Sequence, residues 1–238
     1  MQKTDETRDR KMIKAVIFDM DNTLFDFVEA KIKACKAIID YLKLEEGEGD
    51  EGGEILLGYF LRKKYGFEDL ENIADYMRDK KVYTERDFRE CCLIYEDVKL
   101  KSIKPYPNTL ETLKRLKDLG LRLAVVTDAR NGHAVARLKK TNLFNLFDAI
   151  ISIEMTGKKK PEPDSIKLAL KKLRVDTKNA ILIGDSLKRD IEAGNKLGMI
   201  TVYAAYGDRN FQEEKTTKAD FTLKYSITEI LEVLEKLN

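Results

Sequence analysis

Short, nearly continuous apolar runs recur along the chain and alternate with amphipathic segments. Such runs are typical of strands that are buried on both faces of a sheet, and they cover residues 13–18, 121–127, 148–153, 179–184, 199–204 and, more briefly, 221–223. Segments between them, such as 107–120 and 189–198, have helical spacing and end in glycine. The alternation predicts an α/β fold with a mainly parallel sheet, covered by helices on both faces in a three-layer core.

The interval from residue 24 to residue 104 departs from this alternation. It contains no convincing buried strand, and its apolar residues follow helical spacing in four segments, 27–42, 55–65, 70–80 and 85–98. Pro105 and Pro107 then return the chain to the alternating pattern. The pattern therefore predicts a helical domain inserted into the α/β core.

These observations give a domain layout. We expect a disordered tail at 1–12, a core domain formed by 13–23 and 105–238, and the inserted helical domain at 24–104. Within the insertion, six acidic residues and four glycines at 45–54 predict a solvated loop, because neither helix nor strand tolerates such a segment well.

Composition and charge narrow the classes of function. Apolar residues make up 43% and charged residues 36%, which indicates a globular, highly soluble protein. The 44 basic and 42 acidic residues leave a formal charge of +2, which gives no support to nucleic-acid binding. No apolar run reaches the about 18–20 residues that span a bilayer, and the N-terminus lacks the apolar stretch of a secretory signal. We therefore expect a cytoplasmic protein without nucleic-acid or membrane partners, whose oligomeric state the sequence leaves open.

Two features of the composition refine this expectation. Lys and Glu are abundant whereas Gln occurs only at Gln2 and Gln212, a bias that fits the ion-pair chemistry of heat-adapted proteins. Cys35, Cys91 and Cys92 show no Cys-x-x-Cys spacing, which indicates neither a disulfide framework nor a zinc site. We expect reduced, mostly structural thiols.

Polar side chains follow four of the predicted strands, at the edge where active sites of parallel sheets lie. Asp19 and Asp21 come directly after the first strand, although such a pair alone equally fits a cap or a turn. Thr127 and Asp128 end the second strand, and a hydroxyl with backbone amides can bind phosphate oxygens there.

The two remaining strand ends complete the set. Lys160 stands before Pro161 in the loop after the third strand, where the prolines restrict the backbone. Asp185 ends the fourth strand and Asp190 opens the next helix, where an acid is also favoured simply by the helix dipole. Hydroxyl, lysine and carboxylate groups at one sheet edge suit the parts of a phosphoryl transfer reaction.

In this order, the four segments closely resemble the motifs of the haloacid dehalogenase superfamily of phosphohydrolases. The resemblance covers 13–23 and about 105–205, and includes Asp-x-Asp-x-Thr, the strand-end Thr, the Lys-Pro element and Gly-Asp-Ser-x-x-x-Asp. The insertion resembles the four-helix cap of the phosphoglycolate phosphatase-like branch. The resemblance implies a Rossmann-like core with an inserted cap, and a Mg²⁺-dependent phosphatase acting on a small-molecule phosphate ester such as a glycolate, glyceraldehyde, glycerol or sugar phosphate.

The resemblance also implies roles for the site residues. Asp19 would be the nucleophile that forms an aspartyl phosphate, and Asp21 the general acid and base. Asp19 and Asp185 would supply carboxylate ligands to Mg²⁺, which the backbone carbonyl of Asp21 would join. Thr127 and Lys160 would bind the phosphoryl group, while Asp190 would support the lysine or the metal's waters. Asp128 stands where relatives often have Asn, so its phosphate contact is an open expectation.

Other functions stay open at this point. A phosphomutase would use the same nucleophile and return the phosphoryl group to a sugar instead of to water. A phospho-accepting receiver domain fits less well, because it is about half this length and has its acceptor Asp on a later strand. A non-catalytic binding protein would have no need for the full set of reactive side chains. His133, the sole histidine, is expected on the surface of a helix, and Asp21 argues against halide displacement.

Overall fold

A computed structural model describes residues 12–44, 53–62, 64–209 and 217–237. The chain divides into two compact units, one formed by 1–25 with 105–238 and the other by 26–104. The expected tail up to residue 11 and most of the expected acidic loop, residues 45–52, lie outside the described residues.

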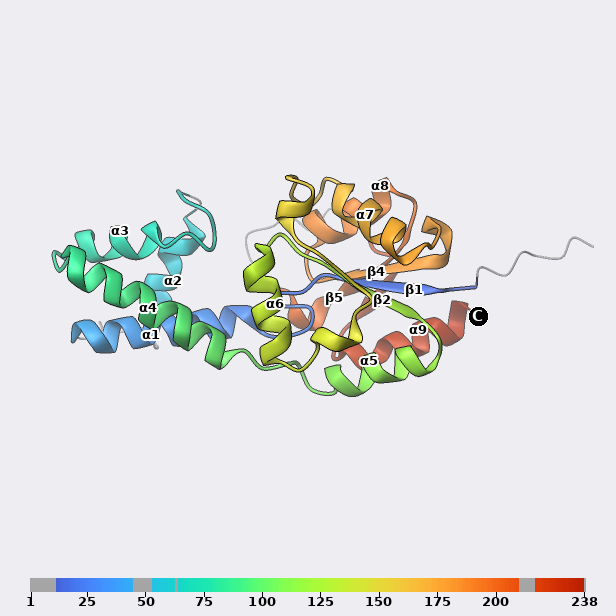
Figure 1. The fold of residues 1–238 in the computed structure, drawn as a ribbon, viewed down its shortest axis with the longest axis horizontal. Helices are drawn as coiled ribbons and strands as arrows, with labels where there is room; N and C mark the ends of the chain where they lie inside the picture. Colours follow the sequence, from blue (N-terminus) through green and yellow to red (C-terminus); the bar gives the residue numbers. More distant parts are fainter. Residues whose placement is uncertain (1–11, 45–52, 63, 210–216, 238) are drawn as a thin grey trace, which may run out of the picture. The chain divides into compact units, whose positions relative to one another are not determined.

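A parallel sheet is the centre of the first unit (Figure 1). Over the described residues it has six strands in the order β3-β2-β1-β4-β5-β6, and every neighbouring pair runs parallel. The strands are β1 (Ala15–Phe18), β2 (Arg122–Val126), β3 (Ala149–Ile151), β4 (Ala180–Gly184), β5 (Ile200–Ala204) and β6 (Phe221–Leu223). The apolar runs form strands because both faces of the sheet are buried, as all residues of β1 and β4 show.

Helices cover both faces of this sheet. In Figure 1, α5 (Thr109–Asp118) and α9 (Ile230–Leu237) lie on one face, and α7 (Asp164–Leu173) and α8 (Glu192–Lys196) on the other. One apolar core cluster joins α7 to the sheet through residues such as Ile166, Leu170, Ile17 and Leu182. The helix α6 (Asn131–Lys140) follows β2. The predicted α/β fold, a Rossmann-like core with a parallel sheet, is confirmed.

The second unit is helical in its described residues. It contains α1 (Phe27–Leu42), α2 (Glu54–Leu61), α3 (Glu71–Asp79) and α4 (Glu85–Ser102). Two of these helices begin at side-chain caps, where Asp26 accepts the amide hydrogen of Glu29 at 2.9 Å and Thr84 accepts that of Asp87 at 3.0 Å. Their apolar faces meet in a core of buried residues that includes Ile38, Leu56, Phe60, Ile73, Met77 and Tyr95.

Local structure differs from the sequence patterns at two places. The segment predicted as one helix from residue 189 begins as a π-helical turn at Leu187–Ile191, and α8 follows it. Glu54, expected in the acidic loop, is the first residue of α2. The first of these turns is capped by the Ser186 side chain, which accepts from the amide of Arg189 at 3.1 Å, a contact that apolar spacing does not predict.

Two expectations about the rest of the chain can be compared with the structure. None of the helices that the structure describes is long and apolar enough to cross a membrane. Cys35 and Cys91 are buried and Cys92 is half-buried, all as free thiols. Burial raises the pKa of Cys91 to about 12 and that of Cys92 to about 11, which disfavours the reactive thiolate.

Candidate active site

The carboxyl ends of the central strands bring the predicted residues to one edge of the sheet. In the sheet register Phe18 of β1 is level with Val125 of β2 and Ile183 of β4. The residue after Phe18 is Asp19, and its amide donates to the carbonyl of Ile183 at 2.8 Å. Parallel pairing therefore places Asp19 beside the ends of both neighbouring strands, where Thr127 and Asp185 follow.

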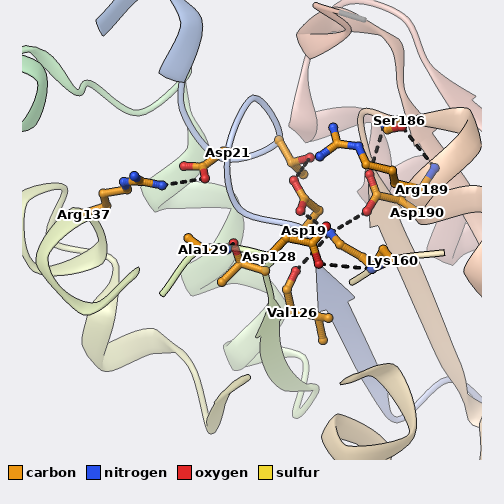
Figure 2. A network of polar contacts seen from close by, with 12 residues as sticks. Asp19, Asp21, Val126, Asp128, Ala129, Arg137, Lys160, Ser186, Arg189 and Asp190 are labelled. Atoms are coloured by element: carbon orange, nitrogen blue, oxygen red, sulfur yellow. Dashed lines mark hydrogen bonds and ion pairs between the residues drawn. The ribbon is translucent and has the colours of Figure 1, made fainter. Parts of the chain in front are cut away.

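Lys160 is at the centre of a buried network of charges (Figure 2). Its ammonium group donates to a carboxylate oxygen of Asp19, to Asp190 Oδ1 at 2.6 Å and to the carbonyl of Val126 at 3.3 Å. The Lys160 side chain is 1% exposed, so water screens these interactions little. Lys160 is separated in sequence by 141 positions from Asp19 and by 30 positions from Asp190. The fold therefore brings distant parts of the chain together in this network.

The pKa values of these groups follow from burial and from their neighbours. Burial alone would lower the pKa of Lys160, but the charges of Asp19 and Asp190 outweigh it and raise this pKa above its ordinary value. Burial raises the pKa of Asp19 and exceeds the opposing effect of Lys160. Burial, and then the charges of Asp19 and Asp190, hold the pKa of Asp185 well above its ordinary value. The site therefore has an excess of buried carboxylate that a further cation would relieve.

Three carboxylates offer such a cation a place. One oxygen from each of Asp19, Asp185 and Asp190 lies within 4.8 Å of the others, and all three residues are buried. Carboxylate oxygens are the ligands that Mg²⁺ prefers, so this donor set fits a hard divalent cation. Asp190 is already engaged, because its Oδ1 accepts from Lys160 and its Oδ2 from the amide of Ser186 at 3.0 Å. Both oxygens of Asp19 also accept hydrogen bonds, from Lys160 and from Thr23, so these contacts do not rank Asp19 above Asp190 as a direct ligand.

Thr127 and Asp128 lie at the end of β2. The hydroxyl oxygen of Thr127 accepts from the amide of Ala129 at 3.1 Å, and this bond leaves the hydroxyl hydrogen available to a ligand. Asp128 Oδ1 accepts from the backbone amide of Lys160 at 3.1 Å. The carboxylate of Asp128 thus holds the lysine loop against the end of β2.

Asp21 points away from the lysine network. In Figure 2 its side chain extends to the opposite side of Asp19 from Lys160, toward α6. There its Oδ2 accepts from the guanidinium of Arg137 at 2.7 Å. Asp21 remains 21% exposed, whereas Arg137 is 2% exposed. The two ion networks therefore flank Asp19.

A family model for haloacid dehalogenase-like hydrolases matches residues 16–204, which include every one of these residues. The chain belongs to the haloacid dehalogenase-like hydrolase family. The predicted resemblance and the predicted class of enzyme, a phosphatase of this family, are confirmed.

Similar proteins of the family match almost the whole chain. A glyceraldehyde 3-phosphate phosphatase of Methanocaldococcus jannaschii is 31% identical over 236 residues, which cover 95% of this chain and 99% of the relative. A phosphoglycolate phosphatase of Neisseria meningitidis is 30% identical, covering 94% of each chain. Among solved structures, a Thermotoga maritima protein assigned as a β-phosphoglucomutase has a TM-score of 0.77 at 21% identity and covers 95% of this chain and 100% of that one.

Several residues of this haloacid dehalogenase-type site were not found by sequence reasoning. The hydroxyl of Thr23 donates to Asp19 Oδ2 at 3.1 Å, so it fixes the second carboxylate oxygen. Gly184 faces Asp190, because a Cβ added to it would lie 2.4 Å from the Asp190 Cβ. The position of Thr23 within the Asp-x-Asp-x-Thr signature was a usable signal. Gly184 stands in the Gly-Asp-Ser-x-x-x-Asp segment and was likewise a usable signal, whereas Arg137 offered none, because a helical arginine occurs in any protein.

His133 and Cys91 lie on helices, rather than at the strand ends that carry the site residues. His133 is half-buried in the first turn of α6. Cys91 belongs to the apolar core of the helical unit.

Proposed function

We propose that the chain is a Mg²⁺-dependent phosphatase that hydrolyses small phosphorylated metabolites through an aspartyl phosphate on Asp19. The observation that carries the proposal is the buried contact of Lys160 with both Asp19 and Asp190, next to Asp185 at the sheet edge. A lysine fixed in this way serves a reaction in which a carboxylate must approach a phosphate dianion.

The side chains can perform the reaction in two steps. Asp19, held by Thr23 and Lys160, attacks phosphorus, so that a carboxylate–phosphorus bond forms and the bond to the ester oxygen breaks. Asp21 gives its proton to the departing alkoxide. In the second step Asp21 takes a proton from water, the water oxygen bonds to phosphorus, and Asp19 is released with inorganic phosphate.

The remaining residues bind and orient the phosphoryl group. Thr127 donates its hydroxyl hydrogen to a phosphoryl oxygen, and Lys160 neutralises part of the negative charge there. Asp190 and Asp128 hold the side chain and the backbone of Lys160, respectively. Mg²⁺, when held by Asp19, Asp185 and the backbone carbonyl of Asp21, supplies further charge neutralisation.

The helical unit 26–104 is proposed as the cap that selects the leaving group and excludes bulk water. The names of similar proteins support substrates with a short carbon chain, such as glyceraldehyde 3-phosphate and phosphoglycolate. We further propose a heat-adapted protein, on the ground of the Lys and Glu bias and of surface ion pairs such as Lys33 with Glu29 at 3.1 Å. The cytoplasmic location stays a proposal from the sequence, on which these ion pairs have no bearing. A midpoint of thermal unfolding above about 65 °C is expected, and a lower one would contradict the heat-adaptation proposal.

Phosphate release tests the proposed function. The purified protein, the Asp19→Asn variant and an Asp118→Asn control are incubated with 4-nitrophenyl phosphate, glyceraldehyde 3-phosphate, phosphoglycolate and pyrophosphate, each with Mg²⁺ or with EDTA. Asp118 is an exposed carboxylate at the end of α5 and is therefore a matched control. We expect phosphate release only with Mg²⁺. The rate of release should fall by at least about 10³-fold in Asp19→Asn and stay at the wild-type rate in Asp118→Asn.

Two further measurements separate the alternatives. Transfer of the phosphoryl group between positions of a sugar phosphate, seen by ³¹P NMR without release of inorganic phosphate, would replace the phosphatase by a phosphomutase. Binding of Mg²⁺ and phosphate without turnover of any ester would indicate a binding protein.

A further inference from the structure

Arg137 is an anomaly in the pattern of α6. Ala134 and Leu138 are buried on the same face of the helix, and Thr141, which follows it, is buried as well. Apolar spacing therefore predicts an apolar side chain at position 137, where the chain has a guanidinium that is 2% exposed. Burying such a cation is costly unless a carboxylate meets it with good geometry.

The carboxylate that meets it is the one that the proposed reaction requires to move protons. Arg137 donates to Asp21 Oδ2 at 2.7 Å, across 116 residues of sequence. A charge-assisted hydrogen bond of this length from a planar donor fixes direction as well as distance.

Backbone hydrogen bonds fix the turn around Asp21, so the position of its carboxylate depends on the side-chain conformation. Asn22 has a left-handed backbone with φ of 62°, and its amide donates to the carbonyl of Phe25 at 2.8 Å. The amide of Leu24 donates to the carbonyl of Met20 at 2.9 Å, which closes the same turn. With this turn closed, the two side-chain torsions of Asp21 decide where its carboxylate lies.

We infer that Arg137 is a positioning residue that holds the Asp21 carboxylate on the side of Asp19 opposite Lys160, where a leaving-group oxygen is protonated. This inference rests on the proposed function of Asp21. Figure 2 shows the arrangement: Lys160, Asp190 and Arg189 lie on one side of Asp19, and Asp21 with Arg137 on the other. The nucleophile and its acid are thus held by separate buried cations that come from different loops and helices.

Leaving-group dependence tests the inference. Departure of 4-nitrophenolate needs little help from an acid, whereas an alkoxide must be protonated as it leaves. For an enzyme of this kind kcat/KM reports the steps up to phosphoryl transfer to Asp19, before water enters. We therefore compare kcat/KM for 4-nitrophenyl phosphate and for glycerol phosphate in the full chain with Mg²⁺.

The variants are Arg137→Met, Arg137→Gln and Arg137→Lys, with Asp21→Asn as reference and Arg115→Gln as control. Arg115 is an exposed arginine on α5. We expect Arg137→Met and Arg137→Gln to lower kcat/KM for glycerol phosphate by about 10–100-fold, as a misplaced reacting group does, and to lower it far less for the aryl ester. Arg137→Lys, which keeps a donor and a charge, recovers part of the loss. If Arg137→Met does not fold, Arg137→Gln, which is shorter but retains hydrogen-bond donors, gives the same comparison.

The outcomes distinguish failure of the inference from failure of the proposed function. Equal losses with both esters, or no loss with either, would overturn the positioning role of Arg137 and leave a purely structural one. A wild-type protein that hydrolyses neither ester would contradict the phosphatase itself. If Asp21→Asn shows equal losses with both esters, the assignment of Asp21 as the acid is wrong and the inference fails with it.

Discussion

Replacing Lys160 by Met removes the cation that holds the buried carboxylates together. The ammonium contacts Asp19 and Asp190, and both partners are at least nine-tenths buried. Met has a similar length and fills the space, so the change removes charge more than volume. Breaking a buried pair by deleting one partner costs about 3–5 kcal/mol, because the remaining charges are left without compensation.

This cost predicts a measurable loss of stability. For a protein of this size, each kcal/mol lowers the midpoint of thermal unfolding by about 2–4 °C, so Lys160→Met is expected to unfold about 6–20 °C lower than the wild type at pH 8. Unfolding is followed by circular dichroism in EDTA, so that bound metal does not contribute. Lys159→Met is the matched control, because Lys159 is exposed and adjacent in sequence.

The pH dependence gives the sign of the effect. Burial raises the pKa of Asp19 and Asp185 above the ordinary value of 3.8, so the folded protein binds protons that the unfolded chain has lost. Stability therefore falls as pH rises from about 4 through the folded pKa values. Lys160 opposes this fall, and its own contribution persists until the pH passes its raised pKa. The deficit of Lys160→Met is consequently largest at pH 8 and shrinks toward pH 4, where the carboxylates are neutral.

Two results would refute this reasoning. A Lys160→Met variant as stable as the wild type at pH 8 would show that the network does not stabilise the fold. A deficit of the same size at every pH would show that lost packing, rather than uncompensated charge, is the cause.

Three further predictions concern single contacts. Asp185→Asn raises the Mg²⁺ concentration for half-maximal activity by at least about tenfold, and an unchanged Mg²⁺ titration would remove Asp185 from the metal site. Gly207→Ala places a Cβ 1.7 Å from the carbonyl oxygen of Asn22, so the loop that bears Asp21 must shift. We expect a lower kcat and a loss of about 1–3 kcal/mol in the free energy of unfolding. Unchanged kinetics would contradict this close packing. Asp128→Asn keeps an acceptor for the backbone amide of Lys160, whereas Asp128→Leu does not. Only Asp128→Leu should therefore lower kcat/KM, by about two- to tenfold. Equal effects of the two variants would contradict the assigned contact.

Much of the core could be predicted because its strands are buried on both faces. Continuous apolar runs then mark the strands, and in a parallel sheet the residues after them must gather at one edge. Asp19, Thr127 and Asp185 could be placed in this way. Lys160 was selected among three consecutive lysines by its position before Pro161, and the structure buries it while Lys158 and Lys159 are exposed.

The contacts that orient these residues could not be predicted, because they join distant parts of the chain. Arg137 stands in α6 where apolar spacing favours an apolar side chain, and the sequence of the helix does not show which carboxylate pairs with it. Only the packing of α6 against the loop after β1 reveals its partner. Gly207 is similar, since its need to be glycine arises from Asn22, which precedes it by most of the chain. The contact of Asp128 with the Lys160 amide likewise depends on how two loops meet.

The central claim is that Asp19 carries the phosphoryl group during turnover, and peptide mass spectrometry of an acid-quenched reaction tests it most directly. The Asp21→Asn variant is mixed with 4-nitrophenyl phosphate and Mg²⁺, because this ester can transfer its phosphoryl group without an acid while the loss of the base slows hydrolysis of the intermediate. We expect one phosphoryl group on the peptide that contains Asp19, and none when Asp19 is also replaced by Asn. The contradicting result has two parts: no phosphorylated peptide is found, and inorganic phosphate forms at the same rate as 4-nitrophenolate. That result would show direct attack by water on the ester, without an aspartyl phosphate on Asp19.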